Sequence, residues 1–107
     1  MLNAIQNIKF LDTNNFFLIA GPCVIENHTT PLLIAETIKE ISERLQIPFI
    51  FKASYKKANR SKLESFTGIG DTEALEIIKE IGLKNKIPTI TDIHSVDEAL
   101  FASEYVD

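Results

Sequence analysis

The chain has 107 residues, of which 45% are apolar and 24% are charged, enough for one small globular domain. Its net charge of −4 disfavours non-specific nucleic-acid binding, which needs a broadly basic surface. No apolar run approaches the ~20 residues of a membrane span, and the first residues lack the character of a signal peptide. The single cysteine excludes an internal disulfide and agrees with a reducing compartment. We therefore expect a cytoplasmic protein that binds neither nucleic acid nor membrane.

Residues 1–15 predict a short β-hairpin, or an opening strand that covers another part of the fold. Residues 5–10 alternate loosely between apolar and polar side chains, and the sequence DTNN at 12–15 is a dense turn signal. Residues 16–20 (FFLIA) then predict a buried strand.

Two long helices are predicted from their ends and their apolar spacing. Thr30 followed by Pro31 predicts an N-cap and the first helical position. Asp71 predicts the cap of the second helix, and Gly82 or Asn85 predicts its end. The apolar stripes at helical spacing are Leu32, Ala35, Ile38, Ile41 and Leu45 in the first helix, and Ala74, Ile77, Ile78 and Ile81 in the second.

Further strands alternate with these helices. Residues 47–52 and 88–92 predict buried strands, and residues 95–98 (SVDE) have the form of a capping box that opens a third helix. Residues 105–107 predict the first residues of a fourth strand. The alternation predicts parallel βα units with right-handed crossovers.

The predicted fold class is α/β, with residues 1–107 forming one partial domain. Because a (β/α)₈ TIM barrel needs about 250 residues, the chain is expected to be the amino-terminal part of such a barrel. Residues 1–15 would be the amino-terminal strand or hairpin, and residues 16–107 about three βα units. The alternative is a small open α/β sheet.

A cluster of cationic side chains follows the second predicted strand. Five cationic residues fall between Lys52 and Lys62 with no acid among them, whereas the remaining six face 15 acids elsewhere. Lys, Arg, Asn and Ser together suit a small phosphorylated or carboxylated ligand. Lys52 and Ser54 occupy alternate positions and hence one side of the strand end, where parallel α/β proteins place their sites. We therefore predict an anion site rather than a solvated charged loop.

Polar residues also follow the other two strands, Cys23 and Glu26 after the first and Asp92 and His94 after the third. Taken singly, each has an ordinary structural explanation, such as a small buried thiol or a solvated loop histidine. The carboxyl ends of barrel strands gather at one face, so the three groups together predict one site.

Several segments together resemble a known enzyme family, the 3-deoxy-D-manno-octulosonate 8-phosphate synthases. The match runs in order from Phe16 onward and covers about the first third of such an enzyme. The most specific segments are KANRS and TDIH. The matching segments are AGPCVIE at 20–26, FKAS at 51–54, KANRS at 57–61, SFTGIG at 65–70 and TDIH at 91–94.

The resemblance implies a (β/α)₈ barrel, usually a homotetramer, that condenses phosphoenolpyruvate with D-arabinose 5-phosphate for lipopolysaccharide biosynthesis. It implies that Lys52 and Lys57 bind phosphoenolpyruvate, and that residues 59–61 hold arabinose 5-phosphate, Arg60 and Ser61 reaching into an adjacent subunit's site. The implied catalytic residues are Lys57, Asp92 and His94, and the implied substrate-binding residues are Lys52, Ser54, Lys57, Asn59, Arg60 and Ser61.

The resemblance also implies a metal. Metal-dependent members of the family carry cysteine after Gly-Pro and metal-independent members carry asparagine, so Cys23 indicates the metal-dependent group. A thiolate prefers a borderline or soft divalent ion, and zinc, iron or manganese is expected. The family's other metal ligands would lie outside this chain, so the 107 residues alone are expected to be inactive.

The sequence departs from the family at Lys56, where many relatives have an acid, and at Lys62, where serine is frequent. Two alternatives remain open. One is the related 3-deoxy-D-arabino-heptulosonate 7-phosphate synthase, which usually carries Lys-Pro-Arg-Thr-Ser where this chain has KANRS. The other is a non-catalytic module whose lysines recruit a phosphorylated partner.

Overall fold

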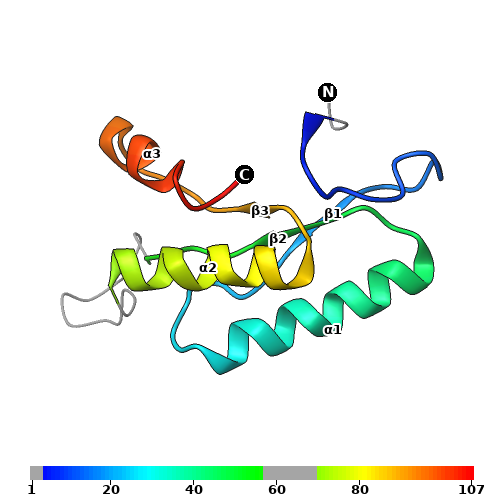
Figure 1. The fold of residues 1–107 in the computed structure, drawn as a ribbon, viewed down its shortest axis with the longest axis horizontal. Helices are drawn as coiled ribbons and strands as arrows, with labels where there is room; N and C mark the ends of the chain where they lie inside the picture. Colours follow the sequence, from blue (N-terminus) through cyan, green and yellow to red (C-terminus); the bar gives the residue numbers. More distant parts are fainter. Residues whose placement is uncertain (1–3, 57–69) are drawn as a thin grey trace.

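The computed structural model describes residues 4–56 and 70–107, in which strands and helices alternate along the chain (Figure 1). The three strands form a parallel sheet in the order β1-β2-β3. This arrangement confirms the predicted α/β class with parallel βα units. The elements are β1 (Leu18–Ala20), α1 (Thr29–Leu45), β2 (Phe49–Lys52), α2 (Asp71–Asn85), β3 (Thr89–Ile90) and α3 (Val96–Ala102).

Residues 4–17 contain no strand, so the predicted amino-terminal hairpin is wrong. The segment instead runs beside the carboxyl end of α1. Lys9 Nζ lies 3.1 Å from Glu43 Oε2, and Thr13 Oγ1 and Asn15 Nδ2 each donate a hydrogen bond of 3.1 Å to the Gln46 carbonyl. These bonds satisfy backbone groups that the end of a helix leaves unpaired. Positive φ angles that no regular strand adopts occur at Asn7, Phe10 and Asn14.

His28, rather than the predicted Thr30, is the N-cap residue of α1, and the side chain of the preceding Asn27 caps the helix. Its Oδ1 accepts hydrogen bonds from the backbone N–H groups of Thr29 at 3.0 Å and Thr30 at 2.8 Å. Asn27 and Thr30 are both helix-capping types, and Asn27 lies at the position from which a side chain reaches the first free donors. Ile41 and Leu45 are 42% and 53% exposed, so the predicted stripe does not continue to the end of the helix. The buried line runs instead through Pro31, Ala35 and Ser42.

α2 and α3 follow their predicted patterns more closely. Gly70 is the N-cap of α2, so Asp71 lies in its first turn, where an acid suits the helix dipole, and Asn85 is its last residue. Ser95 Oγ accepts a hydrogen bond from the backbone of Glu98 at 3.1 Å, which confirms the capping serine of α3. The predicted stripe of α2 is fully buried at Ala74, Ile77, Ile78 and Ile81.

The chain beyond α3 returns to the sheet beside β3. Asp107 N donates to the Thr89 carbonyl at 3.1 Å, and the Asp107 carboxylate accepts from Thr89 N at 3.0 Å. Residues 105–107 form no strand, but they lie where a fourth parallel strand would pair.

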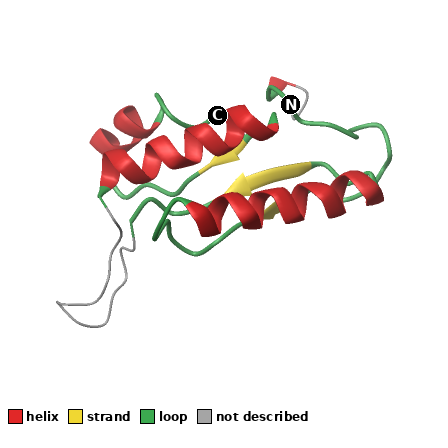
Figure 2. Ribbon diagram, turned by 60° about the horizontal axis from the view of Figure 1, so that its bottom comes forward, coloured by secondary structure: helices red, strands yellow, loops and turns green. Residues whose placement is uncertain are grey.

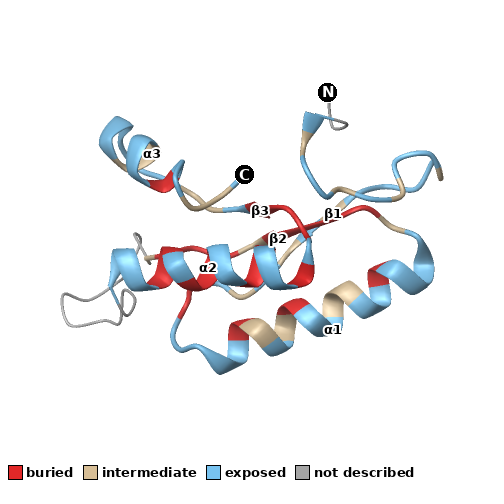
Figure 3. Ribbon diagram, in the orientation of Figure 1, coloured by how far each residue is buried: buried red, intermediate tan, exposed pale blue. Residues whose placement is uncertain are grey.

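One face of the sheet is covered and the other is open. α1 and α2 lie together on the covered face, where the buried residues of the central strand and of α2 meet (Figures 1, 2 and 3). Phe49 and Phe51 of β2 are 5% and 0% exposed. On the edge strands, Ile19 and Ile90 remain 46% and 39% exposed. The open face therefore carries apolar side chains that the described residues leave uncovered.

Candidate functional site

The segments that follow β1 and β2 stay paired beyond the strands themselves. Val24 and Ser54 form a parallel bridge, in which Ser54 N donates to the Cys23 carbonyl at 3.2 Å and Ile25 N donates to the Ser54 carbonyl at 3.0 Å. This pairing brings Cys23 and Ser54 together at the carboxyl end of the sheet, as the sequence predicts.

Gly21 makes this close approach possible. A Cβ atom at Gly21 would lie 1.8 Å from the Lys52 carbonyl oxygen, well inside van der Waals contact. Any side chain there would separate the end of β2 from the segment that leads to Cys23. The backbone therefore fixes the spacing of these two predicted site residues.

Lys52 is the last residue of β2, the central strand. It is half-buried and is in register with Ile90 of β3, and Ala53 N donates to the Ile90 carbonyl at 3.3 Å. The Lys52 backbone thus lies between the chain segments that follow β1 and β3. Ser54 is 8% exposed.

Asp92 and His94 follow β3 at the same end of the sheet. Asp92 Oδ2 lies 3.6 Å from His94 Nε2. Asp92 Oδ1 is buried and has no hydrogen-bond partner within the part of the chain that the structure describes. A buried acceptor that is left unpaired is costly, so this oxygen is suited to accept a hydrogen bond from a ligand.

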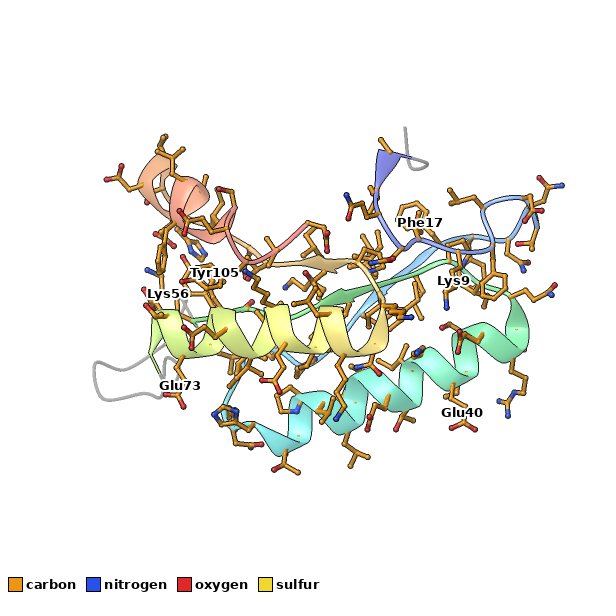
Figure 4. The ribbon with its side chains drawn as sticks, viewed as in Figure 1. Lys9, Phe17, Glu40, Lys56, Glu73 and Tyr105 are labelled. Atoms are coloured by element: carbon orange, nitrogen blue, oxygen red, sulfur yellow. The ribbon has the colours of Figure 1, made fainter. Side chains whose placement is uncertain are left out.

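A cluster around Glu98 joins the segments after β2 and β3, and the sequence did not predict it. Tyr55 Oη donates a hydrogen bond to Glu98 Oε1, Lys56 Nζ lies 3.4 Å from the same oxygen, and His94 Nδ1 lies 3.5 Å from it. Figure 4 shows Lys56 beside the start of α2, with its side chain rising toward α3. We refer to Tyr55, Lys56, His94 and Glu98 as the Glu98 cluster. The capping box gave a partial signal, because it places Glu98 in the first turn of α3 at i+4 from His94.

The charges of this cluster are set by its contacts. The hydrogen bond from Tyr55, helped by the nearby charge of Lys56, lowers the pKa of Glu98 to about 2. Tyr55 is 1% exposed, and its burial together with the Glu98 carboxylate raises the pKa of its phenol. At neutral pH the cluster therefore holds a carboxylate, a neutral phenol and an ammonium group. The sequence of the basic segment contains no acid, but the fold brings the Glu98 carboxylate to Lys56.

Four of the predicted site residues lie outside the described residues. They are Lys57, Asn59, Arg60 and Ser61. The described ones all lie at or just beyond the carboxyl ends of β1, β2 or β3, and they are Cys23, Lys52, Ser54, Asp92 and His94.

The Cys23 thiol is exposed and lines a surface pocket together with Glu26. Within residues 4–56 and 70–107, no three His, Cys, Asp or Glu side chains gather in a way that could hold a metal ion. The described residues thus supply a thiol but not a complete metal site, since a protein zinc site normally has three or four protein ligands.

None of the helices in the described ranges combines the length and the apolar character that crossing a bilayer requires.

Comparison with known proteins gives consistent matches over nearly the whole chain. Residues 3–107 match the model of the DAHP synthetase I family. The chain is 48% identical over 95 residues to a protein of Syntrophobacter fumaroxidans named 2-dehydro-3-deoxyphosphooctonate aldolase, covering 89% of this chain and 33% of that protein. Proteins of the same name match from Burkholderia cenocepacia, at 47% over 92 residues (86% and 32%), and Geobacter metallireducens, at 45% over 104 residues (97% and 38%). The chain spans about a third of the length of these curated relatives.

Proposed function

The chain belongs to the DAHP synthetase I family, and we propose that the complete protein containing it makes 3-deoxy-D-manno-octulosonate 8-phosphate and inorganic phosphate from phosphoenolpyruvate and D-arabinose 5-phosphate. The observation that carries the proposal is the shared name of the relatives, 2-dehydro-3-deoxyphosphooctonate aldolase, at 45% to 48% identity across nearly all of this chain. The product is a precursor for lipopolysaccharide.

The proposed fold of the complete protein is a (β/α)₈ barrel. Two features of this chain support it. The sheet is parallel and has α1 and α2 on one face (Figure 1), while Ile19 and Ile90 on the other face are exposed and would line a barrel interior. Asp107 already lies beside β3, on the side where a further strand would continue the sheet. An open sheet of three strands would leave its apolar face uncovered.

The proposed reaction joins two anionic substrates, and the residues at the strand ends suit that task. Half-buried Lys52 offers a cation at the carboxyl end of the central strand, where it would bind phosphoenolpyruvate together with Lys57. Fixed cations in a partly dry site reduce the repulsion between the substrates and hold the reacting carbons close. Asp92 offers its unpaired Oδ1 to a sugar hydroxyl, with His94 beside it. Residues 59–61, which lie outside the described residues, would hold arabinose 5-phosphate.

We assign Cys23 as one ligand of a divalent metal site whose other ligands lie outside this sequence. Zinc or ferrous iron would suit the thiolate, and manganese would depend more on oxygen ligands from outside this sequence. The complete protein is further proposed to act as a homotetramer in the cytoplasm. Replacing Cys23 with alanine would then lower both the metal content and the activity of the complete protein. Unchanged values of both would overturn the assignment of Cys23 as a metal ligand.

The test of the function is the choice of sugar phosphate. We expect the complete protein to turn over arabinose 5-phosphate with phosphoenolpyruvate, and to use erythrose 4-phosphate poorly. The name of the family model favours one second candidate, 3-deoxy-D-arabino-heptulosonate 7-phosphate synthase, for which the preference would be reversed. Turnover of neither sugar phosphate would overturn both.

A further inference from the structure

We propose that Glu98 and Tyr55 hold Lys56 as an internal counter-ion, so that Lys56 balances charge at the edge of the substrate site without itself binding substrate. The consequence for catalysis rests on the function proposed above. The link between Glu98 and Tyr55 does not depend on that function.

The geometry points to this role because three partners converge on a single carboxylate oxygen. Tyr55 Oη, Lys56 Nζ and His94 Nδ1 all contact Oε1 of Glu98. Its other oxygen, Oε2, lies 3.3 Å from Ser95 Oγ, so both oxygens have partners on the protein. Glu98 is thereby held in place at the start of α3.

Tyr55 makes the cluster more than a surface ion pair. Exposed ion pairs contribute little, because solvent screens them and the side chains lose entropy. Tyr55 is 1% exposed, however, and its hydroxyl donates to Glu98 rather than to water. Because Tyr55 directly precedes Lys56, this partly buried hydrogen bond fixes the backbone from which the Lys56 side chain extends. The side chains of Lys56 and Glu98 are only 34% and 20% exposed.

This arrangement separates Lys56 from Lys52. Lys52 is the last residue of β2 and has no carboxylate within ion-pair distance in the described part of the chain, whereas Lys56 has Glu98. Removing Lys56 would leave Glu98 as an uncompensated negative charge near two anionic substrates. Removing both charges together would restore the balance.

The first experiment titrates Tyr55 in the complete protein, as the difference in tyrosinate absorbance between each protein and its Tyr55→Phe counterpart. Glu98→Gln should lower the apparent pKa of Tyr55 by about one unit or more, which is a tenfold larger dissociation constant of the phenol proton. Asp97→Asn, which removes an exposed charge from the same turn of α3, is the matched control and should leave the titration nearly in place. Equal titration of all three proteins would overturn the link.

The second experiment is a double-mutant cycle in the complete protein. Lys56→Met should raise the KM for both substrates by about two- to fivefold, while kcat stays within about twofold. The double variant Lys56→Met with Glu98→Gln should return KM toward the wild-type value. If Lys56 binds substrate directly, the double variant stays as impaired as Lys56→Met, and the inference is wrong. A wild-type protein without turnover would instead overturn the proposed function, and the tyrosine titration would still decide the link between Glu98 and Tyr55.

Discussion

The two ends of the parallel sheet are held by different kinds of contact. At the amino end, Thr13 and Asn15 donate to the last carbonyls of α1, and these are side-chain contacts to backbone. At the carboxyl end, Tyr55, Lys56 and His94 meet one carboxylate, and these are contacts between ionisable side chains. The first kind completes a helix and depends little on charge. The second gathers charge and proton donors where substrates are proposed to bind.

The largest expected effect comes from closing the space at Gly21. Gly21→Ala would push a methyl group into the Lys52 carbonyl, and since that carbonyl belongs to the backbone and cannot rotate away like a side chain, the strand ends must separate. We expect a loss of about 1–3 kcal/mol in the free energy of unfolding, typical of forced overpacking. Urea denaturation would measure it. An unchanged midpoint would mean that the two segments are not held as closely as the structure shows.

Lys52→Met should separate function from stability. Losing one charged hydrogen-bond donor to an anionic substrate should lower kcat/KM of the complete protein by about 10- to 100-fold. Lys9→Met is the matched control, because Lys9 is exposed at the opposite end and pairs with Glu43. Steady-state kinetics on both variants would check the difference. A similar loss of kcat/KM in both variants would mean that the two ends of the sheet do not differ in their part in catalysis.

Asn15→Ala should have the opposite profile. The variant loses the hydrogen bonds from Asn15 Nδ2 to the carbonyls of Leu45 and Gln46, which are exposed. We expect about 0.5–1 kcal/mol of lost stability and an unchanged KM. Denaturation and kinetics on one preparation would show both. A changed KM would mean that the amino end influences the site.

The smallest effect at neutral pH belongs to the titration of Glu98. Its pKa is lowered from 4.5 to about 2, chiefly by Tyr55, so the stability it contributes is complete above pH 4.5 and is lost as the pH falls toward 2. The wild-type protein should therefore lose more stability across this window than Glu98→Gln does. Urea midpoints at several pH values would show the difference. Parallel curves would mean that Tyr55 and Lys56 do not hold the carboxylate.

Local sequence signals predicted much of the fold. The stripe of α2 and the serine cap of α3 are properties of a few neighbouring residues, and both are confirmed. The hairpin failed because strand pairing needs a partner, and the described residues before Asn14 form no strand with which β1 could pair. The cap of α1 failed because Asn27 and Thr30 are both capping residues, and spacing alone did not rank them.

The candidate site likewise has features that the sequence could predict and features that it could not. Strand order was enough to bring Cys23, Lys52 and Asp92 to one edge, because parallel strands end together. The contact between Lys56 and Glu98 joins residues 42 positions apart and depends on how α3 turns after β3, so no local pattern could predict it. The assignments at residues 57–61 stay predictions, since they lie outside the described residues.

The close approach at Gly21 also has a consequence for protein engineering. The gap between the thiol-bearing turn and the amine-bearing strand is set by main-chain atoms, which do not change when a side chain is exchanged. The side chains at positions 23 and 52 can therefore be exchanged one at a time, because Gly21 keeps the spacing between the two backbone segments unchanged.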